Sequence, residues 1–182
     1  RCAAKDALQV KFSEDTSLTG FITTSESSYR SAVDELVGWC DSNHLLLNVA
    51  KTKEVVVDFR RDPPPPRPLI IKGDEVEIVG EYKYLGSVID SRLEWSANTQ
   101  AIVKRANQRL YFMRRLNSFQ VSRRLLELFY KATVESVLTF NSLCFFGNLR
   151  EYDKARLSKI TKTATKLIGH PVTDLQVHFE AK

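Results

Sequence analysis

The sequence predicts an α+β protein, in which a small antiparallel sheet with one packed helix is followed by a helical bundle. Before about residue 95, short β-prone runs surround one segment with helical periodicity; after it, apolar residues recur at helical spacing. The charge changes at the same place. Residues 1–95 hold 12 Lys and Arg and 16 Asp and Glu, net −4, whereas residues 96–182 hold 15 and 6, net +9. We therefore expect domains at 1–95 and 96–170 and a tail at 171–182.

The first half begins with a predicted hairpin and a helix. Two β-prone runs, 8–12 and 16–22, flank Ser13-Glu14-Asp15, so these polar residues are expected at the hairpin tip. Apolar residues from Tyr29 to Cys40 then follow the i, i+3, i+4 pattern, which predicts an amphipathic helix over 28–42.

Three further β segments are expected before residue 95. The run Lys53–Phe59 indicates a buried strand, and the prolines of 63–68 indicate a stiff connection. Residues 69–79 predict a hairpin that turns at Gly73-Asp74. Residues 82–89 predict one more strand, in which Gly86 marks a bulge or a close backbone approach.

Three helices are predicted in the second half. The first covers about 97–117 after an N-cap at Ser96, with an inward face made of Ile102, Ala106, Leu110 and Met113. The second begins after Ser122 and has an apolar face made of Leu126, Phe129, Val134 and Val137. The third covers 151–168 and ends at Gly169, with these residues expected inward: Tyr152, Ala155, Ile160, Ala164 and Leu167.

Composition excludes several classes of protein. No apolar run reaches the roughly 18 residues of a membrane span, so no membrane partner is expected. The three cysteines, Cys2, Cys40 and Cys144, are far apart and lack paired spacing, which argues against a disulfide framework or a zinc site. A reducing, intracellular setting, nucleus or cytoplasm, is therefore expected. The basic second half suggests a polyanionic partner, most simply nucleic acid, and composition alone is equally compatible with a solvated basic surface.

The adjacent acids Glu14 and Asp15 are the strongest chemical signal in the first half. Two Mg²⁺ ions about 4 Å apart need clustered oxygen ligands, and a tight turn presents neighbouring carboxylates together. Taken alone, such a turn is more often a hydrated acidic loop. The strings around it carry more information than the turn itself.

Four strings in order resemble the reverse transcriptases of non-LTR (LINE-type) retrotransposons. They are KFSEDTSLTGFI, the helix ending in Leu36-x-x-Trp39-Cys40, LLLNVAKTKEVVVDF and EYKYLGSVID. The resemblance covers about residues 8–169 and corresponds to palm motifs C, D and E followed by the thumb. It implies an RNA-directed DNA polymerase as the parent activity, with Mg²⁺ as its cofactor.

The resemblance assigns roles only at matching positions. Glu14 and Asp15 match the metal-binding acids of motif C, although Glu14 stands where the family has Asp, and Lys51 matches the motif D lysine that donates a proton to pyrophosphate. Tyr82, Tyr84, Leu85 and Gly86 match the primer-holding motif E. The thumb match implies phosphate contacts, in an RNA/DNA duplex or hybrid, by Lys104, Arg105, Arg109, Arg114, Arg115, Arg123 and Arg124.

Other features of the family find no match. Only seven residues precede the motif C strand, so motif A, with its essential Asp, and the fingers have no counterpart in this sequence. We therefore expect a truncated chain that does not polymerise DNA, binds no metal tightly and retains at most weak, non-specific nucleic-acid binding.

Three alternatives stay open. Residues of about 81–116 also resemble the N-terminal segment of the alkylated-DNA-repair protein AlkB homologue eight, a label that suggests 2-oxoglutarate dioxygenase or methyltransferase chemistry. The two His and one carboxylate that non-haem iron needs are not indicated by the isolated His44, His170 and His178. The chain is otherwise a non-enzymatic binding module, or a marginally folded remnant without a selected function. The sequence does not determine the oligomeric state.

Overall fold

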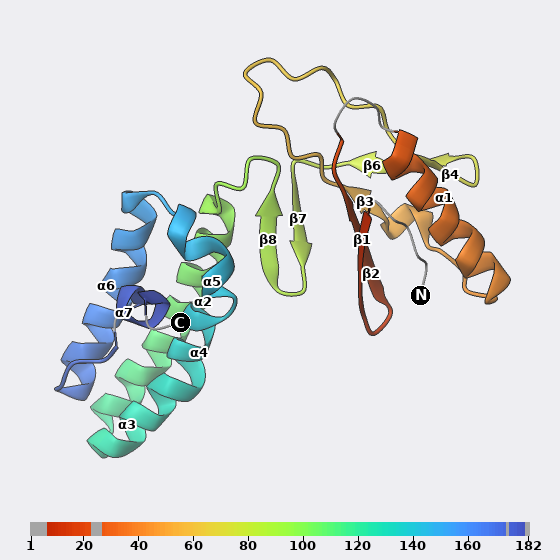
Figure 1. Cartoon of the computed structure of the whole chain (residues 1–182). Coiled ribbons are helices and arrows are strands. Elements are labelled where there is room, and N and C mark those ends of the chain that lie inside the picture. The colour runs from red at the N-terminus through yellow and green to blue at the C-terminus, as the bar shows by residue number, and fades with distance from the viewer. Residues whose placement is uncertain (1–6, 23–26, 174, 181–182) are drawn as a thin grey trace. The chain divides into compact units, whose positions relative to one another are not determined.

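The computed structural model describes residues 7–22, 27–173 and 175–180 and divides the chain into two compact units (Figure 1). The N-terminal unit comprises residues 1–56 and 62–79. The helical unit comprises residues 57–61 and 80–182. The division falls at Val79–Gly80, whereas the sequence pattern places the change near residue 95. The mixed α and β class is confirmed.

The N-terminal unit opens with the predicted hairpin. Strands β1 (Ala7–Phe12) and β2 (Asp15–Gly20) are antiparallel, with Phe12 opposite Asp15, so Ser13 and Glu14 form a two-residue turn. Ser13 has φ 55°, and a positive φ at the first turn position matches the twist of a two-residue hairpin. This prediction is confirmed. Cys2 lies outside the described residues.

Helix α1 (Ser27–Ser42) provides much of this unit's small core. It confirms the helix predicted for 28–42, and its buried residues include Val33 and Cys40. Val33 packs with three residues of the second hairpin region, namely Leu69, Ile71 and Val76.

The predicted single antiparallel sheet is wrong, because the strands form four separate pairs. Strand β3 is only Lys53–Glu54, and it pairs in parallel with β6 (Glu77–Ile78). The expected strand 53–59 ends at Glu54, because its ladder with β6 contains only the pairs Lys53–Glu77 and Glu54–Ile78, and residues 55–59 form no strand. A ladder of two residue pairs constrains the register between β3 and β6 only weakly.

The hairpin expected at 69–79 is present but turns one residue earlier than predicted. Strands β4 (Ile70–Ile71) and β5 (Asp74–Glu75) pair antiparallel, and the turn is Lys72-Gly73. Both turn residues have positive φ, 54° and 91°, as a type I′ turn requires. Gly at the second position, rather than Asp74, meets that requirement.

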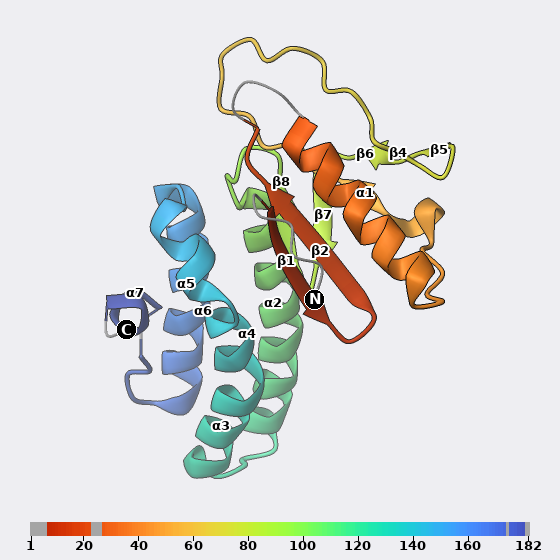
Figure 2. The same ribbon diagram turned by 45° about the vertical axis from the view of Figure 1, so that its right-hand side comes forward.

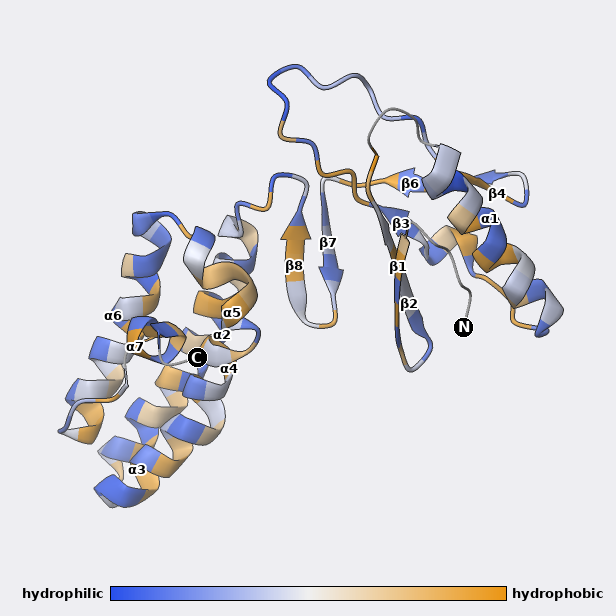
Figure 3. Cartoon of the chain, in the orientation of Figure 1, coloured by the Kyte–Doolittle hydropathy of each residue, from blue (hydrophilic) through white to orange (hydrophobic). Residues whose placement is uncertain are grey.

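The helical unit contains a hairpin where one strand was predicted. Strands β7 (Glu81–Tyr84) and β8 (Ser87–Asp90) are antiparallel, and Leu85-Gly86 forms their turn. Leu85 has φ 45° and Gly86 φ 93°, so Gly86 is a turn residue and not a bulge. Strand β8 is hydrophobic where β7 is hydrophilic (Figure 3), which accords with the contact of β8 with helix α2 (Ser96–Ser118).

Asp90 connects β8 to the start of α2. Its Oδ1 accepts hydrogen bonds from the backbone N–H groups of Arg92 and Glu94, both at 3.0 Å, and its Oδ2 accepts from Trp95 at 2.9 Å. The predicted N-cap at Ser96 is wrong: Trp95, with φ 62°, precedes the helix, and the Ser96 hydroxyl donates to Asp153 Oδ2 at 2.9 Å.

Helix α2 confirms the segment predicted for 97–117. All four residues expected to face inward are buried, namely Ile102, Ala106, Leu110 and Met113. The helix contacts β8, α6 and the helices that follow α2 in the chain (Figure 2).

The second predicted helix contains a π-helical segment. It comprises α3 (Arg123–Phe129), the π segment Tyr130–Glu135 and α4 (Ser136–Thr139). Ser122 occupies the N-cap position without a side-chain cap bond. The buried residues recur every four positions, at Leu126, Tyr130, Val134 and Leu138. A repeat of four drifts around a helix of 3.6 residues per turn, and the wider π turn reduces that drift.

The remaining helices close the core. Helix α5 (Ser142–Phe145) and a 3₁₀ turn (Phe146–Asn148) lead into α6 (Glu151–Ile168), which ends at Gly169 with φ 89°, as predicted. Tyr152 and Ala155 are exposed, contrary to prediction, because Leu157, Ile160, Ala164 and Ile168 set the buried face of α6. In the expected tail, α7 (Leu175–Glu180) buries Leu175.

No helix in the described part of the chain is both long enough and apolar enough to span a membrane.

We predict that Leu110→Ala lowers the free energy of unfolding of the helical unit by about 2–5 kcal/mol, because it leaves a cavity in the core. Leu110 is 1% exposed. Leu128→Ala, at a residue 62% exposed on α3, is the matched control and should change stability by no more than about 0.5 kcal/mol. Urea unfolding followed by circular dichroism makes the comparison, and equal effects would contradict the packing described.

We predict that Asp90→Asn lowers stability at neutral pH by about 1 kcal/mol. Burial raises the pKa of Asp90, but the backbone N–H donors outweigh it and hold the pKa below the ordinary carboxyl value. The carboxylate therefore contributes stability above that ordinary value and loses it as pH falls through the lowered pKa. The gap between wild type and variant should close in acid. Asp62→Asn, in the exposed proline-rich segment, should show no such gap at any pH.

Candidate nucleic-acid interface

The two acids predicted from motif C lie at the tip of the β1–β2 hairpin. Glu14 is in the turn, Asp15 is the first residue of β2, and both are exposed. Among residues 7–22, 27–173 and 175–180, no group of three His, Cys, Asp or Glu side chains is placed to hold a metal ion. The described tip therefore presents two solvated carboxylates without a third ligand.

Lys51 lies on a separate feature of the same unit. It is the last residue of the 3₁₀ turn Val49–Lys51, and it is exposed. Its backbone N–H donates to the side-chain Oδ1 of Asn48 at 3.1 Å, while Thr52 donates its hydroxyl to the Asn48 carbonyl at 2.9 Å. The Asn48 cap explains why the turn forms here and leaves the lysine side chain in solvent.

The residues matched to motif E form the β7–β8 hairpin of the helical unit. Tyr82 is 40% exposed on β7, and Leu85 is 38% exposed at the turn. A Cβ at Gly86 would come within 3.3 Å of the Phe140 ring, so glycine serves both the positive φ and the close packing. The Gly86 carbonyl accepts a long hydrogen bond, 3.5 Å, from Arg105 Nη2. The structure thus brings Gly86 and Arg105, two of the predicted site residues, together.

The seven predicted phosphate-binding residues divide into two groups. Arg105 and Arg109 are half-buried, and each donates to backbone carbonyls: Arg105 to Ala101 and Gly86, and Arg109 to Thr133. The other five are exposed and form no ion pair with any described residue; they are Lys104, Arg114, Arg115, Arg123 and Arg124.

The acid Glu127 lies near these cations. Lys131 pairs with Glu127 at 2.8 Å, and the hydrogen bond from Lys131 lowers the pKa of Glu127. His170 Nε2 also lies 3.3 Å from Glu127. The Arg123 guanidinium lies against Gly169 at the C-terminus of α6, where a positive charge is favourable.

A groove lies beside these cations, between α2 and the continuous helix formed by α3, the π segment and α4. Its volume is about 480 Å³. One wall is α2, through Arg109, Phe112, Arg115, Leu116 and, just past the helix end, Phe119. The other wall is Phe129 at the end of α3, Ala132 and Thr133 of the π segment, and Ser136 of α4.

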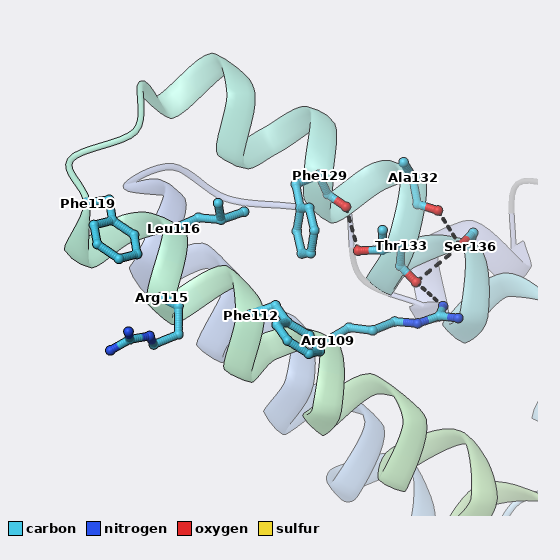
Figure 4. Close-up of a pocket in the computed structure, with 9 residues that line it drawn as sticks. All are labelled: Arg109, Phe112, Arg115, Leu116, Phe119, Phe129, Ala132, Thr133 and Ser136. Carbon is cyan, nitrogen blue, oxygen red and sulfur yellow. Dashed lines mark hydrogen bonds between the residues drawn. The ribbon is translucent and has the colours of Figure 1, made fainter.

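Arg109 joins the two walls of the groove. Figure 4 shows its side chain reaching across from α2, where Nη1 donates to the Thr133 carbonyl. The same carbonyl accepts from the Ser136 hydroxyl at 3.2 Å, and the Thr133 hydroxyl donates to the Phe129 carbonyl at 2.7 Å. These bonds fix one end of the groove, whereas Arg115 and Phe119 lie at the other end and pair at 5.4 Å.

Sequence reasoning missed the aromatic component of this surface. Phe112 and Phe119 are seven residues apart, which places them on one face of the helical period, and Arg109 and Arg115 lie beside that face. The helical periodicity of the next segment predicts Phe129 only as a core residue and gives no sign that it also lines a groove. An interleaving of Arg and Phe along one helix is the signal that indicates this surface.

Comparison with known proteins gives one partial match. The sequence model of a family described as Alkylated DNA repair protein alkB homolog 8, N-terminal, matches residues 95–136. The resemblance expected for about 81–116 is thus supported, but it begins later and extends further. No curated protein and no solved structure matches the chain. The matched segment contains α2, α3, the π segment and every residue that lines the groove.

Proposed function

We propose that the chain is a non-enzymatic binding module whose helical unit binds nucleic acid through the matched segment 95–136. The observation that carries this proposal is charge. The segment holds eight Lys and Arg and two Glu, net +6, and Lys131 alone of its cations forms an ion pair among the described residues. Cations without acidic partners on ordered helices are available to phosphates.

The proposed binding is weak and indifferent to base sequence. Phosphate contacts release condensed counterions, so affinity falls as salt rises, and such binding has a Kd on the order of 10⁻⁴ to 10⁻⁶ M at physiological salt. Phosphates carry no base identity, so all sequences should bind alike. The proposal does not include iron or 2-oxoglutarate chemistry, which the name of the matched family suggests, because His44, His170 and His178 form no metal-ligand group with other described residues.

We predict that replacing Lys104, Arg114 and Arg124 by Gln weakens binding of a labelled RNA/DNA hybrid and flattens its salt dependence. The slope of log affinity against log salt should fall by up to about 0.9 for each phosphate that the variant no longer binds. Fluorescence anisotropy at several salt concentrations measures it. All three residues are exposed, so the fold should be retained.

The matched control removes the same charge from α6, by replacing the exposed residues Lys159, Lys162 and Lys166 by Gln. The proposal expects a smaller change of slope in this control. Equal changes would assign binding to net charge alone, and an affinity that ignores salt would contradict phosphate binding altogether.

A second candidate is that the chain derives from the palm and thumb of a LINE-type reverse transcriptase. Two hairpin turns favour it. The turn Ser13-Glu14, directly before Asp15, and the turn Leu85-Gly86 each have two residues and begin at a residue with positive φ, at the positions matched to motifs C and E, and a helical unit follows. In that parent family a Mg²⁺ pair would bind the motif C acids and Lys51 would protonate pyrophosphate.

Under this second candidate we predict no nucleotide incorporation on a primed template by the 182-residue chain, with either Mg²⁺ or Mn²⁺. Two solvated carboxylates at a turn, one of them Glu14 with an extra methylene, give an incomplete and displaced ligand set. Extension of a labelled primer, resolved on a gel, is the measurement. Template-dependent incorporation that Asp15→Ala abolishes would overturn the prediction.

A further inference from the structure

We propose that the groove between α2 and the α3–π–α4 helix binds an unpaired base of single-stranded nucleic acid, with Arg115 and its neighbouring cations holding the adjacent phosphates. This inference rests on the proposed nucleic-acid binding and names the part of the ligand that the groove would take. Its basis is the combination of exposed aromatic rings, cations and an open volume on one pair of helices.

The aromatic side chains of the α2 wall are exposed to a degree that core packing does not explain. Phe112 is 57% exposed and Phe119 is 68% exposed, although the same helix buries Leu110 and Met113 almost completely. Tyr111, also 57% exposed, contacts Phe112 edge-on at 5.6 Å. Exposed aromatic rings in a row beside cations are the usual platform for stacking successive bases without sequence preference.

The cations lie where phosphates of a stacked strand would pass. Arg115 lies over the Phe119 ring at 5.4 Å and points away from the opposite wall (Figure 4). Arg109 is held by the Thr133 carbonyl, so it orders the groove and leaves Arg115 as its outward charge. No acidic residue lines the groove, which favours an anionic ligand over a cationic one.

The dimensions and shape of the groove favour a base over a duplex. Its 480 Å³ lies within the range of small-ligand sites, and Phe112 and Phe129 face it from opposite walls. Bases inside a duplex are already stacked, and extracting one costs a few kcal/mol. A single strand offers the same base faces without that cost. An acidic amphipathic peptide would also satisfy charge, but flat rings separated by cations match the alternation of bases and phosphates more closely.

The test compares a labelled oligothymidylate with a labelled blunt duplex of the same length, by fluorescence anisotropy at low salt. The double variant Phe112→Ala, Phe119→Ala should weaken single-strand binding by about fivefold or more, the usual loss for one stacked base, and leave duplex binding unchanged. Tyr152→Ala is the matched control, because Tyr152 is 72% exposed on α6 outside the groove. The rescue variant Phe112→Tyr, Phe119→Tyr should bind like wild type.

Each other outcome overturns the inference in a distinguishable way. If the Ala variant binds the single strand like wild type while duplex binding stays salt-dependent, the groove assignment fails and the proposed function stands. If neither nucleic acid binds at low salt, both fail. If a synthetic acidic amphipathic peptide binds through Phe112 and Phe119 and the oligothymidylate does not, the groove is a protein-docking site. Circular dichroism confirms that each variant is folded.

Discussion

Burial of one apolar stripe along α2 is the constraint on which the helical unit depends. Ile102, Ala106, Leu110 and Met113 are each at most 2% exposed, and the helix contacts β8, α3, α4 and α6. Because this stripe faces the core, the opposite and flanking positions of a 23-residue helix must face water. The cations and exposed rings of α2 owe their placement to that geometry.

The N-terminal unit has no comparable core among its described residues. Its buried apolar cluster is Val33, Leu69, Ile71 and Val76, joined only by partly buried neighbours. The β1 strand meanwhile leaves Leu8, Val10 and Phe12 at alternate positions between 42% and 65% exposed. Alternate residues of a strand share one face, so this hairpin presents an apolar face that a larger sheet or another surface would ordinarily cover. The larger of the two described cores therefore lies in the helical unit.

Sequence reasoning succeeded where periodicity was long and failed where turns decided the structure. The helices at 28–42, 97–117 and 151–168 were predictable because several turns of apolar spacing agree. The β7–β8 hairpin was missed because Leu85 is a poor residue for positive φ, so the turn carried no strong signal apart from Gly86. Tyr152 was misplaced because it was assigned to the same face as Ala155, whereas the phase set by Leu157 and Ile160 turns both outward.

The candidate site was likewise predicted only in part from the sequence. The basic residues were visible in the sequence, and five of the seven are exposed as phosphate ligands must be. The hydrogen bonds of Arg105 and Arg109 to carbonyls were not visible, because they depend on contacts between residues 19 and 24 positions apart. The groove was hidden for the same reason, since its second wall depends on a helix whose turn widens at Tyr130.

That widened turn has a consequence for how the chain tolerates changes of length. A π turn accommodates one residue more than an α turn over the same rise, so deleting a residue between Phe129 and Ser136 would let the segment relax into ordinary helix. The residues after the deletion would then keep their phase about the helix axis, so Val137 and Leu138 would still face the core. The π turn thus absorbs one residue without disturbing the core, and a deletion there would change mainly the local backbone around the Thr133 carbonyl that Arg109 binds.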